Sequence, residues 1–170
     1  VQRYPDLLIE GCSGGGGRFD AGMLYYTPQI WCSDDTDAIE RLSIQYGTSF
    51  GYPVSTMGSH VSHCPNEQTR RIAPLNTRAT VAMSGTFGYE LDVNKMSGEE
   101  KEIVKAQIQE FKKYYDLIQY GDYYRLTDPD TVEAYHGWEF AASDGSEALL
   151  CIVALQIHPN GPGRWMCLKG

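Results

Sequence analysis

The order of hydrophobic patterns along this chain constrains its fold more than any other feature. Short apolar runs alternate with helical patterns over residues 1–120, which is typical of a parallel sheet whose strands are connected by helices. From residue 121 onward the pattern changes to short strands separated by turns, which favours antiparallel pairing. The sequence therefore predicts an α/β part in residues 1–120 and antiparallel β structure in residues 121–170.

The first part is expected to contain four strands: residues 6–10, 26–32, 49–55 and 86–92. The first of these is a continuous apolar run, which is typical of a strand buried on both faces. One helix is expected after the acidic segment 33–37 and is predicted to end at Gly47, because glycine often follows the last helical turn. Two further helices are expected at residues 77–83 and 97–118. In the longer one, Ser97 and Glu100 are predicted to form a capping box.

The second part shows a different spacing of apolar residues. Strands are expected at residues 122–126, 138–143, 147–157 and 164–168. The turn sequence at residues 143–147 predicts a hairpin between the second and the third of these strands.

The composition restricts the partners and the compartment that the chain is expected to have. Its formal net charge of −8 argues against nucleic acid or an anionic membrane surface, because both need a basic patch. The chain has no apolar run of about 18 residues, and residues 1–6 lack the long apolar region of a signal peptide. Its first strand starts so early that the chain is expected to begin inside a domain. The five cysteines are widely spaced without a CxxC pair, which favours a reducing, cytoplasmic setting. A secreted protein with one or two disulfides stays open.

Four consecutive glycines, residues 14–17, follow the first predicted strand. A phosphate-binding P-loop needs a lysine and a hydroxyl after its last glycine, but Arg18 and Phe19 stand there. A dinucleotide fingerprint fails as well, because Phe19 occupies the position of its final glycine. Two interpretations remain, a flexible surface loop or a backbone that approaches a ligand closely at the carboxyl end of a strand.

Three carboxylates, Asp34, Asp35 and Asp37, follow the second predicted strand. Aspartate and threonine often cap helices, so Thr36 or Asp37 is expected to do only that. A helix N-terminus favours the ionised form of an aspartate, which suits a nucleophile or a cap but not a general acid. Asp34 lies farthest from the helix and is therefore the predicted general acid.

Several long motifs occur in one order: "LLIEGCSGGGGRFD", "SDDTDAIERL", "IQYGTS" and "GTFGYELD". Together they resemble the bacterial α-galactosidases of glycoside hydrolase family 36, and the resemblance covers roughly residues 4–126. It implies a (β/α)8 catalytic barrel with a β domain before it and another after it. The chain would then be the C-terminal half of this TIM barrel, residues 1–120, followed by part of the C-terminal antiparallel β domain, residues 121–170.

The resemblance also implies an activity and a set of site residues. The family releases terminal α-linked galactose from melibiose- or raffinose-type oligosaccharides with retention, which requires two carboxylates about 5–5.5 Å apart. Its acid/base is the first aspartate of an S-D-[ND]-T-D motif, which is Asp34 here, although many relatives have asparagine at the next position. The cysteine and a glycine of its C-S-G-G motif contact galactose, which implies substrate contacts at Cys12 and Gly15, with Ser13 and Gly14 between them.

The family's nucleophile belongs to a Lys-[Trp/Tyr]-Asp-x-Asn-Arg motif, and the chain contains no such motif. The resemblance therefore implies a fragment that is inactive alone, in a complete bacterial cytoplasmic protein that forms a homotetramer and needs no cofactor or metal. Two alternatives stay open: a catalytically inactive sugar-binding relative, and a relative that acts on α-linked N-acetylgalactosamine.

Two further features have competing interpretations. His60 and His63, with Cys64 beside them, could ligate a metal, but a third cluster of ligands is not evident, so a loop near the sugar site is the favoured interpretation. Trp31 could stack on a sugar ring, but a place in the buried core is favoured, since it ends a strand.

Overall fold

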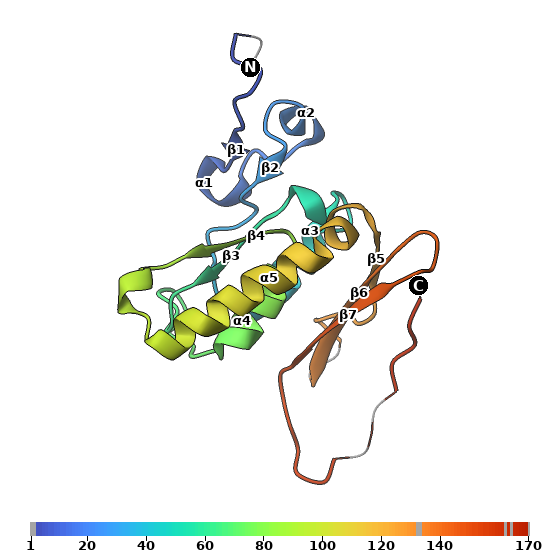
Figure 1. Ribbon diagram of the computed structural model, residues 1–170. Helices are drawn as coiled ribbons and strands as arrows, with labels where there is room; N and C mark the ends of the chain where they lie inside the picture. Colours follow the sequence, from blue (N-terminus) through green and yellow to red (C-terminus); the bar gives the residue numbers. More distant parts are fainter. Residues whose placement is uncertain (1–2, 132–133, 162, 164, 170) are drawn as a thin grey trace.

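The computed structural model describes residues 3–131, 134–161, 163 and 165–169 (Figure 1). Two short strands, β1 (Glu10–Gly11) and β2 (Gln29–Ile30), pair in parallel at one end of the molecule. Between them lie two single turns, α1 (Ser13–Gly16) and α2 (Ala21–Leu24). Asp20 caps α2 by accepting a hydrogen bond from the backbone N–H of Met23.

A second parallel pair contains β3 (Gly58–Ser62) and β4 (Thr86–Glu90), and a parallel bridge between Ile30 and Met57 connects it to β2. The helix α3 (Ala38–Thr48) and the 3-10 turn η1 (Val54–Thr56) lie between β2 and β3, and α4 (Leu75–Ala82) lies between β3 and β4. The turn η2 (Val93–Lys95) and the long helix α5 (Gly98–Tyr120) follow β4. Parallel pairing therefore runs in chain order, with helical structure after each strand.

The predicted strand at residues 49–55 is wrong. The helix α3 continues through Gly47 to Thr48, and the chain then turns into η1. The strand that follows is β3, whose sequence "GSHVS" has a single large apolar residue, Val61, and so gives almost no hydrophobic signal. Its pairing with β4 and the complete burial of Val61 define the strand instead.

The strand predicted at residues 6–10 to be buried on both faces is also wrong. Only Glu10 and Gly11 form β structure, and the side chains of Leu7 and Leu8 are 53% and 85% exposed. Within the described residues β1 pairs with β2 alone, so no second layer covers these leucines. The strand predicted at residues 26–32 is shortened to Gln29–Ile30.

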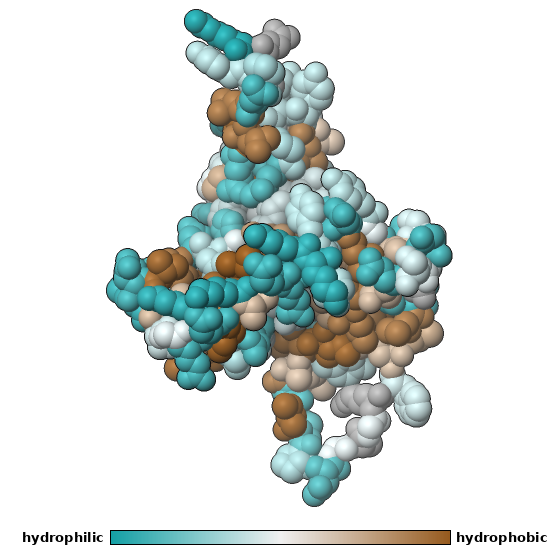
Figure 2. All heavy atoms as spheres, in the orientation of Figure 1, coloured by the Kyte–Doolittle hydropathy of each residue, from teal (hydrophilic) through white to brown (hydrophobic). Residues whose placement is uncertain are grey.

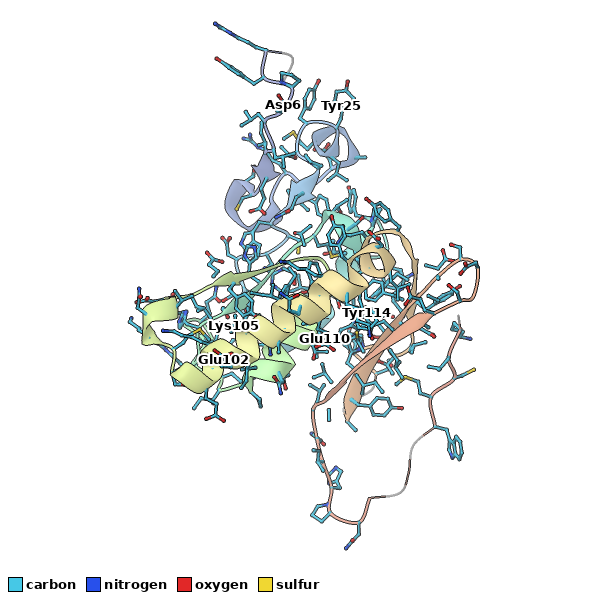
Figure 3. All side chains as sticks on the ribbon, in the orientation of Figure 1. Asp6, Tyr25, Glu102, Lys105, Glu110 and Tyr114 are labelled. Atoms are coloured by element: carbon cyan, nitrogen blue, oxygen red, sulfur yellow. The ribbon has the colours of Figure 1, made fainter. Side chains whose placement is uncertain are left out.

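The capping box of α5 is confirmed. The Ser97 hydroxyl accepts a hydrogen bond from the N–H of Glu100, and the Glu100 carboxylate accepts one from the N–H of Ser97. Charged side chains such as Glu102 and Lys105, which form an ion pair of 2.6 Å, lie on its outer face (Figure 3). None of the helices in the described ranges combines the length and the apolar character that a membrane span requires.

After α5 the strands are antiparallel. The strands β5 (Asp122–Arg125), β6 (Tyr135–Ala141) and β7 (Ala148–Ala154) form one sheet in that order, and a turn with Gly145 at φ +70° joins β6 to β7 as a hairpin. Of the strand predicted at residues 164–168, residue 164 lies outside the described residues, and residues 165–168 form no strand.

The helix α5 lies between the β3–β4 pair and this three-stranded sheet (Figure 1). One side packs Phe111 against Phe87 of β4, with ring centroids 4.9 Å apart. The other side contributes to the main core, which draws on both parts of the chain: Leu42, Val54, Met57, Leu117, Ile118, Trp138, Phe140, Cys151 and Val153. Exposed hydrophobic residues, among them Leu150 and Ile152, gather over the β6–β7 hairpin beneath the charged surface of α5 (Figure 2).

Candidate active site

The four glycines form part of a left-handed turn, called here the glycine turn (Cys12–Gly17). Ser13, Gly14, Gly15 and Gly16 all have positive φ values, between 55° and 84°. The turn is closed by a hydrogen bond of 2.7 Å from the N–H of Gly16 to the carbonyl of Cys12. Residues with a Cβ atom lose about 1–2 kcal/mol each in this conformation, which explains why glycines fill it. The backbone geometry therefore favours a defined turn over a flexible loop.

The glycine turn packs against the segment that follows β2. A Cβ atom on Gly15 would lie 3.3 Å from Oδ2 of Asp34 and 3.1 Å from its backbone nitrogen. A Cβ atom on Gly16 would lie only 2.8 Å from the carbonyl oxygen of Cys32, closer than atoms approach without displacement. Gly15 and Asp34, both predicted site residues, are thus neighbours, because the missing side chain leaves room for the carboxylate.

The other predicted contact residues lie around this point. Cys12 is partly buried and starts the turn, whereas Ser13 and Gly14 are exposed at its tip. A Cβ atom on Gly14 would meet nothing within 4 Å, so that side of the turn is open.

The carboxylates of the acidic segment, called here the acid turn (Ser33–Asp37), have different surroundings. The Asp37 side chain caps α3 by accepting hydrogen bonds from the N–H groups of Ile39 and Glu40, as the sequence predicted for Thr36 or Asp37. The Asp35 carboxylate accepts a hydrogen bond of 2.9 Å from the N–H of Asp37. Asp34 is exposed, and its carboxylate accepts no hydrogen bond from the residues that the structure describes.

Asp37 is the most constrained of the three, with 2% of its surface exposed. Burial alone would raise its pKa, but hydrogen bonds from the Thr69 hydroxyl and the Ile39 N–H, and the ion pair with Arg71, outweigh this effect. The pKa of Asp37 is therefore held below its ordinary value, and the residue is ionised at neutral pH. It serves as a cap and an ion-pair partner, not as a proton donor.

Arg41 of α3 holds the acid turn from the inside. Its guanidinium donates hydrogen bonds of 2.7 Å to the carbonyl oxygens of both Ser33 and Asp35, and only 4% of the residue is exposed. It also lies over the ring of Trp31, 4.2 Å from the centroid. Burial lowers the pKa of Arg41, and the nearby Asp34 and Asp35 carboxylates oppose this change. No pattern in the sequence predicts this role for Arg41.

Trp31 lies in the protein interior, as favoured from the sequence, with 9% of its surface exposed. The face of its ring is stacked on His60, with centroids 4.9 Å apart, and His60 lies 3.4 Å from the Glu90 carboxylate. His63 is paired instead with Glu67. Within the described ranges no group of three or more His, Cys, Asp or Glu side chains could hold a metal ion.

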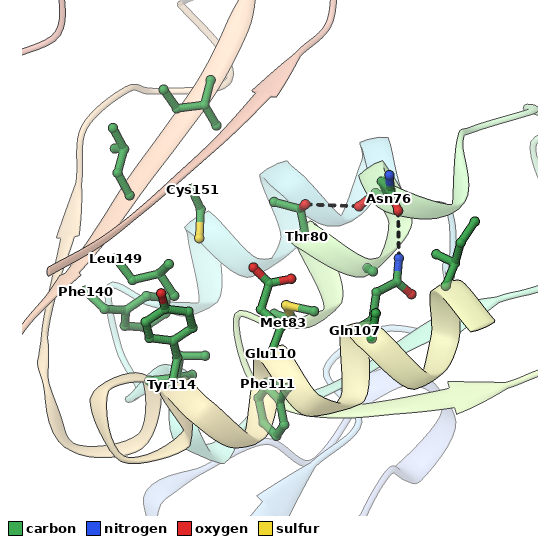
Figure 4. A pocket seen from close by; sticks show the side chains of 16 residues that line it. Asn76, Thr80, Met83, Gln107, Glu110, Phe111, Tyr114, Phe140, Leu149 and Cys151 are labelled. Carbon is green, nitrogen blue, oxygen red and sulfur yellow. Dashed lines mark hydrogen bonds between the residues drawn. The ribbon is translucent and has the colours of Figure 1, made fainter. Parts of the chain in front are cut away.

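A separate cavity of about 460 Å³ lies between α4, α5 and the β6–β7 hairpin (Figure 4). Its lining includes Glu110, Tyr114 and Cys151, but neither Asp34 nor any residue of the glycine turn. Burial raises the pKa of the Cys151 thiol to about 12, so this cysteine is protonated at neutral pH and is a poor nucleophile. The glycine turn and the acid turn therefore remain the candidate active site.

Comparison with known proteins identifies relatives of this chain by family and by sequence. The Melibiase family model matches residues 1–121. The chain is 56% identical over 168 residues to the bifunctional alpha-galactosidase/sucrose kinase AgaSK of Mediterraneibacter gnavus, covering 99% of this chain and 18% of that protein. It is 52% identical to the alpha-galactosidase AgaA of Geobacillus stearothermophilus, covering 100% of this chain and 23% of that protein.

The fold of this chain also matches solved structures of alpha-galactosidases. A crystal structure of a variant of the GH36 alpha-galactosidase AgaA in complex with raffinose has 50% sequence identity and a TM-score of 0.96, covering 99% of this chain and 23% of that one. The galactosidase domain of AgaSK has 56% identity and a TM-score of 0.96, again covering 99% of this chain and 23% of the other. The chain thus spans about a fifth of the length of these relatives, and it belongs to the Melibiase family.

Proposed function

We propose that this chain is part of a retaining α-galactosidase in which Asp34 is the catalytic acid/base. Residues 1–120 form the C-terminal half of its (β/α)8 barrel, and residues 121–170 begin its C-terminal antiparallel β domain. The parallel order β1-β2-β3-β4 supports the barrel half. The two turns follow the carboxyl ends of β1 and β2, the edge of the strands where barrel enzymes have their active sites.

The observation that carries the assignment is the contact between Gly15 and Asp34. The turn brings backbone, with no side chain, against the one carboxylate of the acid turn that accepts no hydrogen bond within the described residues. Asp35 and Asp37 are both engaged in holding the backbone. Asp34 is therefore the carboxylate that can exchange a proton with the glycosidic oxygen, while Cys12, Ser13, Gly14 and Gly15 line the galactose ring.

Retention requires a second carboxylate about 5–5.5 Å from the first, which attacks the anomeric carbon. We assign this nucleophile to a part of the complete protein outside residues 1–170. In the first step Asp34 gives its proton to the leaving oxygen as the nucleophile displaces it. In the second step Asp34 takes a proton from the water that attacks the galactosyl-enzyme. The substrates proposed are raffinose-type oligosaccharides, since variants of one relative, AgaA, have been crystallised with raffinose and stachyose.

The test compares Asp34→Ala with the unchanged enzyme, both as the full-length protein that contains this chain. On raffinose, whose leaving group needs a proton, kcat/KM is expected to fall about a thousandfold. On an aryl galactoside with a good leaving group, formation of the galactosyl-enzyme needs no proton, so kcat/KM should fall far less. Equal losses on both substrates would contradict the acid/base assignment.

The unchanged protein tests two alternative interpretations, a sugar-binding relative without activity and a relative that acts on α-linked N-acetylgalactosamine. If it binds galactose without hydrolysing any galactoside, it is an inactive sugar-binding relative. If it hydrolyses aryl α-N-acetylgalactosaminides faster than aryl α-galactosides, the proposed specificity is wrong.

A further inference from the structure

Gln68, in the loop between β3 and α4, reaches across to the acid turn. Its side-chain NH2 donates a hydrogen bond to the carbonyl oxygen of Asp34. Its side-chain oxygen accepts hydrogen bonds from the N–H of Thr36, at 3.1 Å, and from the Thr36 hydroxyl, at 3.3 Å. The amide group of Gln68 therefore binds the main chain at both Asp34 and Thr36, the residues on either side of Asp35.

Within the part of the chain that the structure describes, the acid turn pairs with no strand, so its backbone carbonyl groups depend on side chains. Arg41 binds those of Ser33 and Asp35 from the buried side. Gln68 binds the carbonyl of Asp34 from the exposed side. Among the described residues Gln68 is the side chain that restrains the main chain of Asp34 itself, and rotation of that peptide would redirect the carboxyl group.

The loop that carries Gln68 is fixed by the segment it contacts. The buried Asn66 side chain accepts hydrogen bonds from the N–H groups of Gln68, at 2.9 Å, and Thr69, at 3.0 Å. The same side chain donates a hydrogen bond of 3.0 Å to the Thr36 hydroxyl. Thr69 in turn donates to the Asp37 carboxylate. These contacts hold the Gln68 backbone in place even when its side chain is changed.

We propose that Gln68 is a positioning residue for proton transfer, whose amide orients Asp34 toward the glycosidic oxygen. This inference rests on the proposed function of Asp34. Gln68 touches neither the proton nor the sugar in this account and acts only through the main chain of Asp34. Because Gln68 is exposed, its removal opens no core and leaves the fold in place. A small displacement of a catalytic group is costly, since misplacement by about 1 Å can lower a rate about a hundredfold.

The test uses Gln68→Met in the full-length protein, because methionine has a similar length but neither donates to Asp34 nor accepts from Thr36. We expect kcat/KM on raffinose to fall about tenfold. On an aryl galactoside with a good leaving group kcat/KM should fall less than about twofold, since forming the galactosyl-enzyme from this substrate needs no proton. Gln109→Met, the same change at an exposed glutamine of α5, is the matched control and should leave both substrates unaffected.

A second variant, Gln68→Glu, keeps the acceptor for Thr36 but loses the donor to Asp34 and adds a negative charge. A like charge disfavours ionisation of a neighbouring carboxyl group, so the basic limb of the kcat/KM profile on raffinose should move to higher pH. An unmoved limb would show that a charge at position 68 does not reach the Asp34 carboxyl group, and it would count against the positioning role.

The outcomes separate the inference from the function on which it rests. If the unchanged enzyme shows no galactosidase activity, or if Asp34→Ala loses both substrates equally, the proposed function has failed. If Asp34→Ala behaves as expected but Gln68→Met affects both substrates equally, or neither, only the positioning role of Gln68 is overturned.

Discussion

The glycine turn and the acid turn lie against each other, but their backbones are held in place by opposite means. The glycine turn is defined by its own φ values, with one internal hydrogen bond of 2.7 Å between Cys12 and Gly16. The acid turn is held from outside, by side chains of α3 and of the loop after β3. A backbone that must approach a ligand can carry no side chains, whereas one that presents a carboxylate can be restrained through its carbonyl groups.

Arg41→Met gives the largest expected effect on the acid turn. Two partly buried carbonyl groups, of Ser33 and Asp35, would lose their donor, and each loss costs about 1–3 kcal/mol. We expect the free energy of unfolding to fall by about 4 kcal/mol, measured by urea denaturation. Arg41→Lys should restore less than half, because an ammonium group cannot bind both carbonyls as the planar guanidinium does. Full restoration by lysine would show that charge alone supports the turn.

Methyl groups added to the glycine turn should lower the free energy of unfolding. Gly14→Ala places a Cβ in open space, so it should cost only the strain of the left-handed backbone, about 1–2 kcal/mol. Gly16→Ala adds a contact of 2.8 Å with the Cys32 carbonyl and should cost about 3 kcal/mol. Urea denaturation of both variants tests this order. Equal costs would mean that the contact with the Cys32 carbonyl contributes nothing.

The variant Asp37→Asn tests how the stability of the acid turn depends on pH. The folded protein holds the pKa of Asp37 below the ordinary 3.8, so this ionised group stabilises the fold above that pH, and the contribution is lost as pH falls through the folded value. Asparagine can still cap α3 but cannot pair with Arg71. We expect Asp37→Asn to cost about 1.5 kcal/mol at pH 7 and progressively less below about pH 4. A cost independent of pH would contradict the role given to the ion pair.

The smallest effect is expected for Asp35→Asn. The asparagine oxygen can still accept the hydrogen bond from the N–H of Asp37, which is the contact that the structure gives to this side chain. Activity on raffinose should change by less than about twofold, as measured by kcat/KM. A loss comparable to that of Asp34→Ala would show that both carboxylates take part in the reaction.

The sequence predicted those parts of the fold that have local signals. Ser97 and Glu100 predicted the start of α5, because a capping box is a pattern within four residues. The strand β3 was missed because its five residues include one large apolar side chain, and its identity depends on pairing with β4. The apolar run that includes Leu7 and Leu8 predicted a buried strand, but both side chains are exposed. An apolar pattern gives no information about which layer of the protein covers it.

The residues of the candidate site also differ in how far the sequence could predict them. Asp34 and the glycines could be recognised because each stands in a motif at the end of a strand. Arg41 and Gln68 could not, because their partners are main-chain carbonyl groups, which leave no pattern in the sequence. Gln68 is 34 residues from Asp34, and only the packing of two loops brings them together.

The central claim is that Asp34 transfers protons and does not attack the sugar. Its most direct test is the product that the full-length Asp34→Ala variant forms from an aryl α-galactoside in the presence of azide. If Asp34 is the acid/base, the nucleophile still forms a galactosyl-enzyme, which azide attacks from the opposite face to give the α-galactosyl azide with net retention. If Asp34 were the nucleophile, azide would attack the substrate directly and give the β anomer. We expect the α anomer by proton NMR, and the β anomer would contradict the acid/base assignment.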